Sequence, residues 1–218
     1  MCGKFTQMMT WRALHGLYSI SDKFTAPIPP KSAPQDVETV TPVRDASVLV
    51  WENGVYNMKR MRWGFAKKSA KAPGSRPDHI HARAETIDTL PTFADAFASR
   101  RGLLIVKTFN EGKEVRRKTI QHTITPNDGK PMAIAVIFER WEHEDGGELL
   151  TFVMVTTPPN PLVGKITDRM PAVIQRSDWG MWLGEVPATL EQIKALLVTQ
   201  DGDWSMAPEK QSRQPTLF

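Results

Sequence analysis

Cys2, the residue that follows the initiating methionine, carries the most distinctive chemistry in the sequence. If Met1 is removed, the new terminus presents an α-amine and a thiol on adjacent carbons, which is a 1,2-aminothiol. The amine has a reference pKa of about 7.7–8.0, so a useful fraction of it is uncharged at neutral pH. Such an amine can attack an aldehyde to form a Schiff base, and the thiol can then close a five-membered thiazolidine ring. Position alone equally allows Cys2 to be a small residue without a function.

Short motifs along most of the chain favour a function for Cys2. The opening Met1-Cys2-Gly3-Lys4-Phe5 resembles the M-C-G-R-[FY] start of the SOS response-associated peptidase (SRAP) family, whose members form thiazolidine crosslinks to abasic DNA. Further segments resemble family motifs in the same order, at residues 39–42, 62–65, 81–86, 101–111, 156–160 and 166–171. The resemblance spans about residues 1–185, and it implies the fold of that family because chance would scramble the order of the motifs.

The resemblance implies a site of four side chains, two of which are retained here. Cys2 and Glu111 stand at the family's cysteine and glutamate positions, whereas His81 replaces an asparagine and Thr167 replaces a histidine. We expect Glu111 to act as a general acid and base, because opening the abasic sugar and dehydrating the carbinolamine both need proton transfer. His81, with a reference pKa of about 6.5, is expected to donate hydrogen bonds and to supply part of the lost proton chemistry. Thr167 can donate a hydrogen bond but cannot act as a base.

Five further positions of the resemblance imply contacts to the DNA strand. Basic residues are expected to neutralise phosphates near Cys2, and flat side chains are expected to stack on a neighbouring base, which contributes roughly 1–3 kcal/mol per base. The basic residues are Lys4, Arg83 and Arg169, and the flat ones are Pro42 and Trp63. For Trp63, packing in the core is an equally good interpretation.

The last eight residues carry a separate signal, because the chain ends on two large apolar side chains after a polar stretch. Gln214–Phe218 resembles the Q-x-x-L-F peptide with which replication proteins dock on the bacterial sliding clamp, through Gln214, Leu217 and Phe218. Packing of the same residues against the protein's own surface is the alternative.

Composition limits the class of protein. A chain of 218 residues with 40% hydrophobic and 24% charged residues suits one globular domain, expected over residues 1–205 with a flexible tail over 206–218. The balance of 28 basic against 24 acidic residues gives a net charge of +4, compatible with a phosphate-bearing partner. A single cysteine excludes a disulfide within the chain and any multi-cysteine zinc site, and we expect no cofactor. The N-terminus lacks the apolar segment of a secretion signal, which favours a cytoplasmic protein without a membrane span.

The elements that must position these residues are mostly strands. Apolar, β-branched runs predict strands at 46–51, 102–106, 132–138 and 150–156, and helical patterns cover 10–20, 89–99, 177–183 and 189–198. Because strands and helices do not alternate regularly, we expect an α+β fold, a single domain built on an antiparallel, barrel-like sheet with flanking helices. Residues 67–78 are expected to form an exposed loop, and the basic run 113–118 a hairpin tip that is either solvated surface or a DNA contact.

The sequence is compatible with three functions. The first is an enzyme that crosslinks abasic sites through Cys2 in single-stranded DNA, supported by retention of Cys2 and Glu111. The second is a single-stranded DNA binder without catalytic activity, favoured by the substitutions at His81 and Thr167. The third is a cysteine peptidase, for which removal of Met1 is the only cleavage that the sequence motivates.

Overall fold

The apolar runs of the chain form strands that close into a barrel. The structure, a computed structural model, describes residues 2–8, 37–67, 79–116, 118–142 and 147–209. Five of the described strands pair in the order β10-β4-β3-β6-β9, and β9 pairs back with β10 to close the ring. Their bounds are β3 (Asp45–Glu52), β4 (Val55–Trp63), β6 (Arg101–Val106), β9 (Met132–Glu142) and β10 (Glu148–Thr157).

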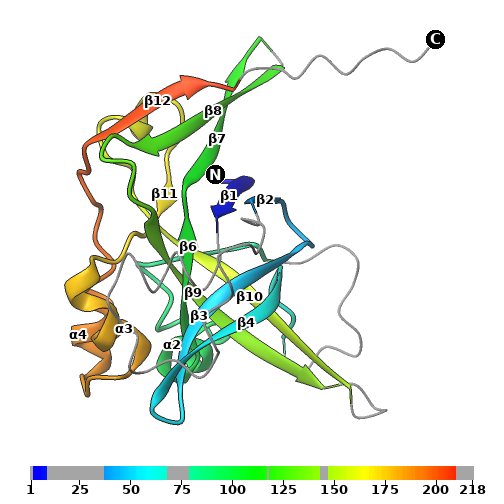
Figure 1. Ribbon diagram of the computed structural model, residues 1–218, viewed down its shortest axis with the longest axis vertical. Coiled ribbons are helices and arrows are strands. Elements are labelled where there is room, and N and C mark those ends of the chain that lie inside the picture. The colour runs from blue at the N-terminus through cyan, green and yellow to red at the C-terminus, as the bar shows by residue number, and fades with distance from the viewer. Residues whose placement is uncertain (1, 9–36, 68–78, 117, 143–146, 210–218) are drawn as a thin grey trace, which may run out of the picture.

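A second, antiparallel sheet stands against one end of the barrel, as Figure 1 shows. Its described strands run in the order β12-β8-β7-β1-β2. They are β1 (Lys4–Met8), β2 (Val37–Val40), β7 (Thr108–Val115), β8 (Lys118–Pro126) and β12 (Trp204–Pro208). Two short strands, β5 (His81–Arg83) and β11 (Met170–Pro171), pair with β10. The chain therefore brings β1, β5 and β7 to neighbouring places although they are far apart in sequence.

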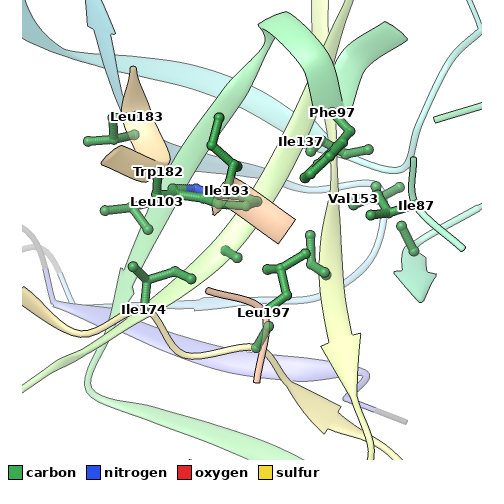
Figure 2. Packing of buried hydrophobic residues seen from close by; sticks show 14 of the residues in the cluster. Ile87, Phe97, Leu103, Ile137, Val153, Ile174, Trp182, Leu183, Ile193 and Leu197 are labelled. Atoms are coloured by element: carbon green, nitrogen blue, oxygen red, sulfur yellow. The ribbon is translucent and has the colours of Figure 1, made fainter. Parts of the chain in front are cut away.

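Strands at the centre of the molecule are buried on both faces. In β6, Leu103 and Ile105 join one apolar cluster while Leu104 and Val106 join another, because successive side chains of a strand point to opposite faces. The first cluster includes the apolar sides of the helices, and Figure 2 shows Leu103 beside Trp182 there. The second cluster contains Cys2. The candidate nucleophile is thus part of a packed core, where neighbouring side chains fix its position.

Short helices flank the barrel on one side (Figure 1). They are α2 (Ala94–Ser99), α3 (Trp179–Leu183) and α4 (Leu190–Ala195), with the 3-10 turns η2 (Val163–Lys165) and η3 (Arg176–Asp178). Thr189 begins α4 with a capping box, in which its hydroxyl accepts from the backbone N–H of Gln192. Gly184 ends α3 in the left-handed conformation, with φ of 88°. Thr189 thus fixes the start of α4 and Gly184 the end of α3, whereas α4 ends at Ala195, before the predicted end at 198.

The predicted α+β, barrel-like fold is confirmed, with differences in detail. All four predicted strands are present, although β10 runs parallel to β4 and β5 in an otherwise antiparallel arrangement. The helix predicted over 89–99 is shorter, because residues 84–93 form turns and a bend before α2 begins. The boundary expected after residue 205 falls inside β12, since residues 204–208 pair with β8. The predicted helix over 10–20, the tail from 210 onward and nearly all of the 67–78 loop lie outside the described residues.

Candidate active site

Pairing between β1 and β7 brings Cys2 next to Glu111. Phe5 lies opposite Phe109, and Lys4 opposite Asn110. Glu111 follows Asn110 in β7, and its charge acts on the thiol of Cys2, which precedes β1. The Cys2 side chain is 1% exposed, and its thiol donates a hydrogen bond to the backbone carbonyl of Lys4 at 3.3 Å. Two candidate residues that are 109 positions apart in the chain are therefore neighbours.

Burial changes the proton affinity of both groups. Glu111 is fully buried, and burial raises the pKa of its carboxyl to about 7, with a smaller upward contribution from the charge of Asp168. Burial likewise raises the pKa of the Cys2 thiol to about 12, and the Glu111 charge adds to this effect. At neutral pH the thiol therefore holds its proton, while the carboxyl is poised to give or take one. A buried carboxyl with a pKa near the working pH is typical of a general acid and base.

His81 comes to the same place from β5. Its backbone lies opposite Met154 of β10, and its ring meets the indole of Trp63 edge to face. Burial lowers the pKa of His81 to about 4. The nearby backbone of Cys2 has a smaller effect, which raises this pKa. Within the described part of the chain, both ring nitrogens are buried and make no hydrogen bond. The imidazole is therefore neutral at pH 7, which corrects the expectation that it would titrate near pH 6.5.

Thr167 belongs to the segment that links η2 to β11. Asn160 anchors the start of this segment, since its side chain accepts from the backbone N–H of Val163 and donates to the carbonyl of Gln200. Thr167 is half-buried, and its neighbour Asp168 raises the pKa of Glu111 through its charge. The structure therefore sets the segment beside the Cys2 and Glu111 pair. The sequence pattern does not indicate Asp168, because this residue occupies the variable position of the motif at residues 166–171.

Trp63 is a core residue rather than an exposed stacking platform. Its side chain is 0% exposed and packs between Phe5 and Phe152, at ring-centroid distances of 5.2 and 6.3 Å. The indole N–H donates to the backbone carbonyl of Ile80 at 2.9 Å. The expectation that Trp63 stacks on a DNA base is wrong in this structure, because no face of the ring reaches solvent. Its two contacts to Ile80 and His81 instead position the histidine.

Two of the three expected phosphate ligands are engaged in ion pairs. Arg169 is 8% exposed and forms a two-pronged pair with Glu85, with nitrogen to oxygen distances of 2.5 and 2.8 Å. The ammonium group of Lys4 lies 2.5 and 2.6 Å from the two carboxylate oxygens of Glu209. A phosphate would have to displace a carboxylate from either cation. Arg169 therefore joins Glu85 and the backbone carbonyl of Thr156 to the segment after η2. This structural role replaces the expected role in binding phosphate.

The other two expected DNA contacts are accessible. Arg83 is exposed at the end of β5, and Pro42 is half-buried in the turn between β2 and β3. That turn holds Val43 in the left-handed region, with φ of 64° and 39% of the side chain exposed. A β-branched residue rarely adopts this conformation, which marks the turn as strained. The structure thus retains Arg83 and Pro42 as surface candidates near β5 and β2.

Comparison with known proteins shows the family to which the chain belongs. Residues 1–211 match the family model described as SOS response associated peptidase (SRAP). The chain belongs to the SRAP family. A similar curated protein is the abasic site processing protein YoaM of Bacillus subtilis, 28% identical over 204 residues that cover 93% of this chain and 88% of the relative. The abasic site processing proteins YoqW and YobE of the same organism are 28% and 27% identical, covering 93% of this chain and 89% and 91% of theirs.

Solved structures share the fold. A protein from Bacteroides thetaiotaomicron superposes with a TM-score of 0.77 at 20% identity, covering 95% of this chain and 92% of that one. A protein from Bordetella bronchiseptica gives the same TM-score at 19% identity, covering 96% of this chain and 100% of that one. Among the described helices, none is both long and apolar enough to cross a membrane.

Proposed function

We propose that this protein processes abasic sites in single-stranded DNA by forming a covalent thiazolidine link through Cys2, once Met1 has been removed. The observation that carries the proposal is the burial of Cys2 beside Glu111, a carboxyl whose pKa is raised to about 7. The names of relatives such as YoaM, an abasic site processing protein, support the same substrate.

The reaction begins with attack of the Cys2 α-amine on the sugar aldehyde, which gives a carbinolamine. Neutral Glu111 then donates its proton to the departing hydroxyl, releasing water and leaving an iminium ion and a carboxylate. Because the thiol of Cys2 holds its proton at neutral pH, the carboxylate of Glu111 takes that proton. The thiolate adds to the iminium carbon, and the ring closes with Glu111 again neutral. The sum is aldehyde plus aminothiol giving thiazolidine plus water.

His81 and Thr167 bind and orient in this scheme. The neutral ring of His81 has two buried nitrogens with no hydrogen-bond partner among the described residues, and one of them is available to a sugar oxygen. Thr167 can donate a hydrogen bond from its hydroxyl group. It cannot transfer a proton as the histidine at this position of the family motif could. We therefore assign proton transfer to Glu111 alone.

The test uses an oligonucleotide that carries one abasic site. Wild-type protein is expected to give a band that survives denaturation, and Cys2→Ala is expected to give none. Cys2→Ser keeps the amine but loses the thiol, so its adduct should appear only after reduction of the imine with borohydride. Mass spectrometry of the wild-type protein must show loss of Met1. An intact Met1 contradicts the proposal because the amine of Cys2 would be blocked, and an equal band from Cys2→Ala contradicts it because the thiol would be unnecessary.

A binder without catalytic activity is the second candidate, favoured by the histidine and threonine at positions 81 and 167. It predicts that wild type and Cys2→Ala bind the oligonucleotide equally and that neither forms a resistant band. The same experiment therefore separates the two functions.

We also propose that Gln214, Leu217 and Phe218 dock on a sliding clamp through the C-terminal peptide, which lies outside the described residues. A pull-down with purified clamp compares the full chain with one that ends at Arg213. Equal recovery of both chains would remove this partner.

A further inference from the structure

The β7–β8 hairpin continues beyond the sheet that carries the site. On one side, β1 pairs with β7 only at residues 108–110. On the other side, β12 pairs with β8 only at residues 122–126. Among the described strands, residues 112–115 therefore pair only with residues 118–121, and the carbonyl of Gln121 also accepts from the backbone N–H of Glu209. Figure 1 shows this hairpin reaching away from the barrel. We refer to residues 112–116 and 118–121 as the β7–β8 ribbon.

The two faces of the ribbon differ in chemistry. Glu111 lies opposite His122, Lys113 opposite Ile120, and Val115 opposite Lys118. Because side chains alternate along a strand, these six residues share the face of Glu111. The opposite face holds Gly112, Glu114, Thr119 and Gln121. The face continuous with the site is therefore cationic, with the ribbon's acidic side chain on the other side.

Apolar side chains accompany the charges on this face. Val115 is 38% exposed and Ile120 is 42% exposed, so both apolar side chains reach the surface on the same face as the lysines. Lysines interleaved with exposed apolar groups suit a strand of nucleic acid, whose phosphates are anionic and whose sugars and bases offer apolar surface.

The turn of the ribbon contains a charged residue, Arg116, in an unfavourable backbone conformation. Arg116 adopts a φ of 48° in the two-residue connection between Val115 and Lys118. Such turns favour Asn and Gly, which tolerate the left-handed conformation. The sequence has Arg116 and Arg117 there instead. The turn therefore carries positive charge in place of residues that favour its geometry.

The cations of the ribbon are available, in contrast to others near the site. Lys4 is held by Glu209 and Arg169 by Glu85. Lys113 and Lys118 are exposed and form no ion pair with any described residue. A phosphate can therefore bind them without displacing a carboxylate.

We propose that the β7–β8 ribbon binds the phosphodiester backbone of the nucleotides on one side of the abasic site, through Lys113, Lys118 and Arg116. The inference rests on the proposed function. From Glu111 to Val115 the strand rises about 13 Å at about 3.3 Å per residue. That length matches about four stacked nucleotides at about 3.4 Å each. The ribbon thus orients the strand so that the abasic sugar meets Cys2.

The test measures binding of an undamaged single-stranded oligonucleotide as a function of salt, by fluorescence anisotropy. The ribbon variant is Lys113→Gln/Lys118→Gln, and the control for net charge is Lys130→Gln/Arg140→Gln, which removes the same charge from exposed cations outside the ribbon that pair with Asp128 and Glu148. Each lost phosphate contact lowers the slope of log affinity against log salt by about 0.7 for a single strand. The ribbon variant should therefore lose about 1.4 from the slope and about tenfold in affinity, whereas the control should match wild type. Equal slopes for all three proteins would overturn the inference.

Shortening the oligonucleotide from each end gives a second readout. Removal of flanking nucleotides on one side should weaken wild type but not weaken the ribbon variant further. Equal sensitivity to both ends, or the same loss in the variant, contradicts the ribbon as the binding element. Wild type is assayed for the crosslink in parallel. Absence of the crosslink contradicts the proposed function, whereas a crosslink together with equal salt slopes contradicts the ribbon alone.

Discussion

The rings of Trp63 and His81 meet edge to face, with centroids 6.0 Å apart and planes inclined at 79°. The indole N–H also holds the carbonyl of Ile80, the residue before His81. A core aromatic side chain thus fixes both the backbone and the ring of a site residue. This relationship assigns Trp63 to positioning rather than to DNA stacking.

Trp63→Phe should therefore lower stability and activity together. The variant leaves a space beside Phe152 and removes one of two donors to the Ile80 carbonyl, the other being the backbone N–H of Met154, so we expect a loss of about 1–3 kcal/mol in the free energy of unfolding. Urea unfolding and the rate of crosslink formation measure the two effects. Weaker binding of undamaged DNA at unchanged stability would instead support a stacking role.

Glu111→Gln should slow the crosslink by about 10²-fold or more, because proton transfer is lost. The same change should stabilise the protein above neutral pH. The pKa of Glu111 is raised from 4.5 to about 7 on folding, so its stabilising contribution is complete below pH 4.5 and is lost as the pH rises through 7. Removing the ionisable group should make Glu111→Gln more stable than wild type by about 2–3 kcal/mol at pH 8, which pH-dependent urea unfolding measures. A variant that is less stable than wild type at pH 8 would contradict the raised pKa.

Glu85→Gln tests the ion pair with Arg169. Hydrogen bonding to Arg169 holds the pKa of Glu85 below its usual 4.5, so the pair stabilises the protein above that pH and its contribution is lost as the pH falls below it. We expect Glu85→Gln to cost about 1–2 kcal/mol at pH 7, since the carboxylate is half-exposed while the arginine is buried. The stabilities of variant and wild type should converge as the pH falls through the lowered pKa of Glu85. A constant difference from pH 3 to 7 would show that the charge of Glu85 is not responsible.

Val43→Asn should stabilise the protein by about 0.5–1 kcal/mol, because asparagine tolerates the left-handed conformation that valine adopts there. Thermal unfolding measures the gain. If the strained turn presents Pro42 to DNA, binding should be retained, because the substitution keeps the backbone of the turn. A loss of stability would mean that Val43 makes apolar contacts that outweigh its strain.

The sequence predicted the strands better than the contacts between them. The runs at 102–106 and 132–138 are apolar at nearly every position. This pattern is typical of a strand that is buried on both faces. Closure of the barrel by β9 and β10 depends on pairing that no local pattern encodes. Likewise, the motif order predicted that Cys2 and Glu111 share a site, but the burial that shifts their pKa values arises from residues throughout the chain.

Partners of the basic residues were the least predictable part. Arg169 and Glu85 are 84 positions apart, and Lys4 and Glu209 are 205 apart. Sequence indicates that an arginine is present but does not show which acid is brought within reach. The choice between core packing and DNA stacking for Trp63 was open for a related reason. An aromatic residue in a strand has the same sequence pattern whether its side chain faces the core or a ligand.

The ion pair between Lys4 and Glu209 has a practical consequence for anyone who prepares this protein. It fastens Glu209, the last described residue, to Lys4 of the first strand, two positions along the chain from Cys2. An affinity tag at the N-terminus would block the amine of Cys2. Recombinant material is therefore best made untagged, or with a C-terminal tag that a protease removes before any activity is measured.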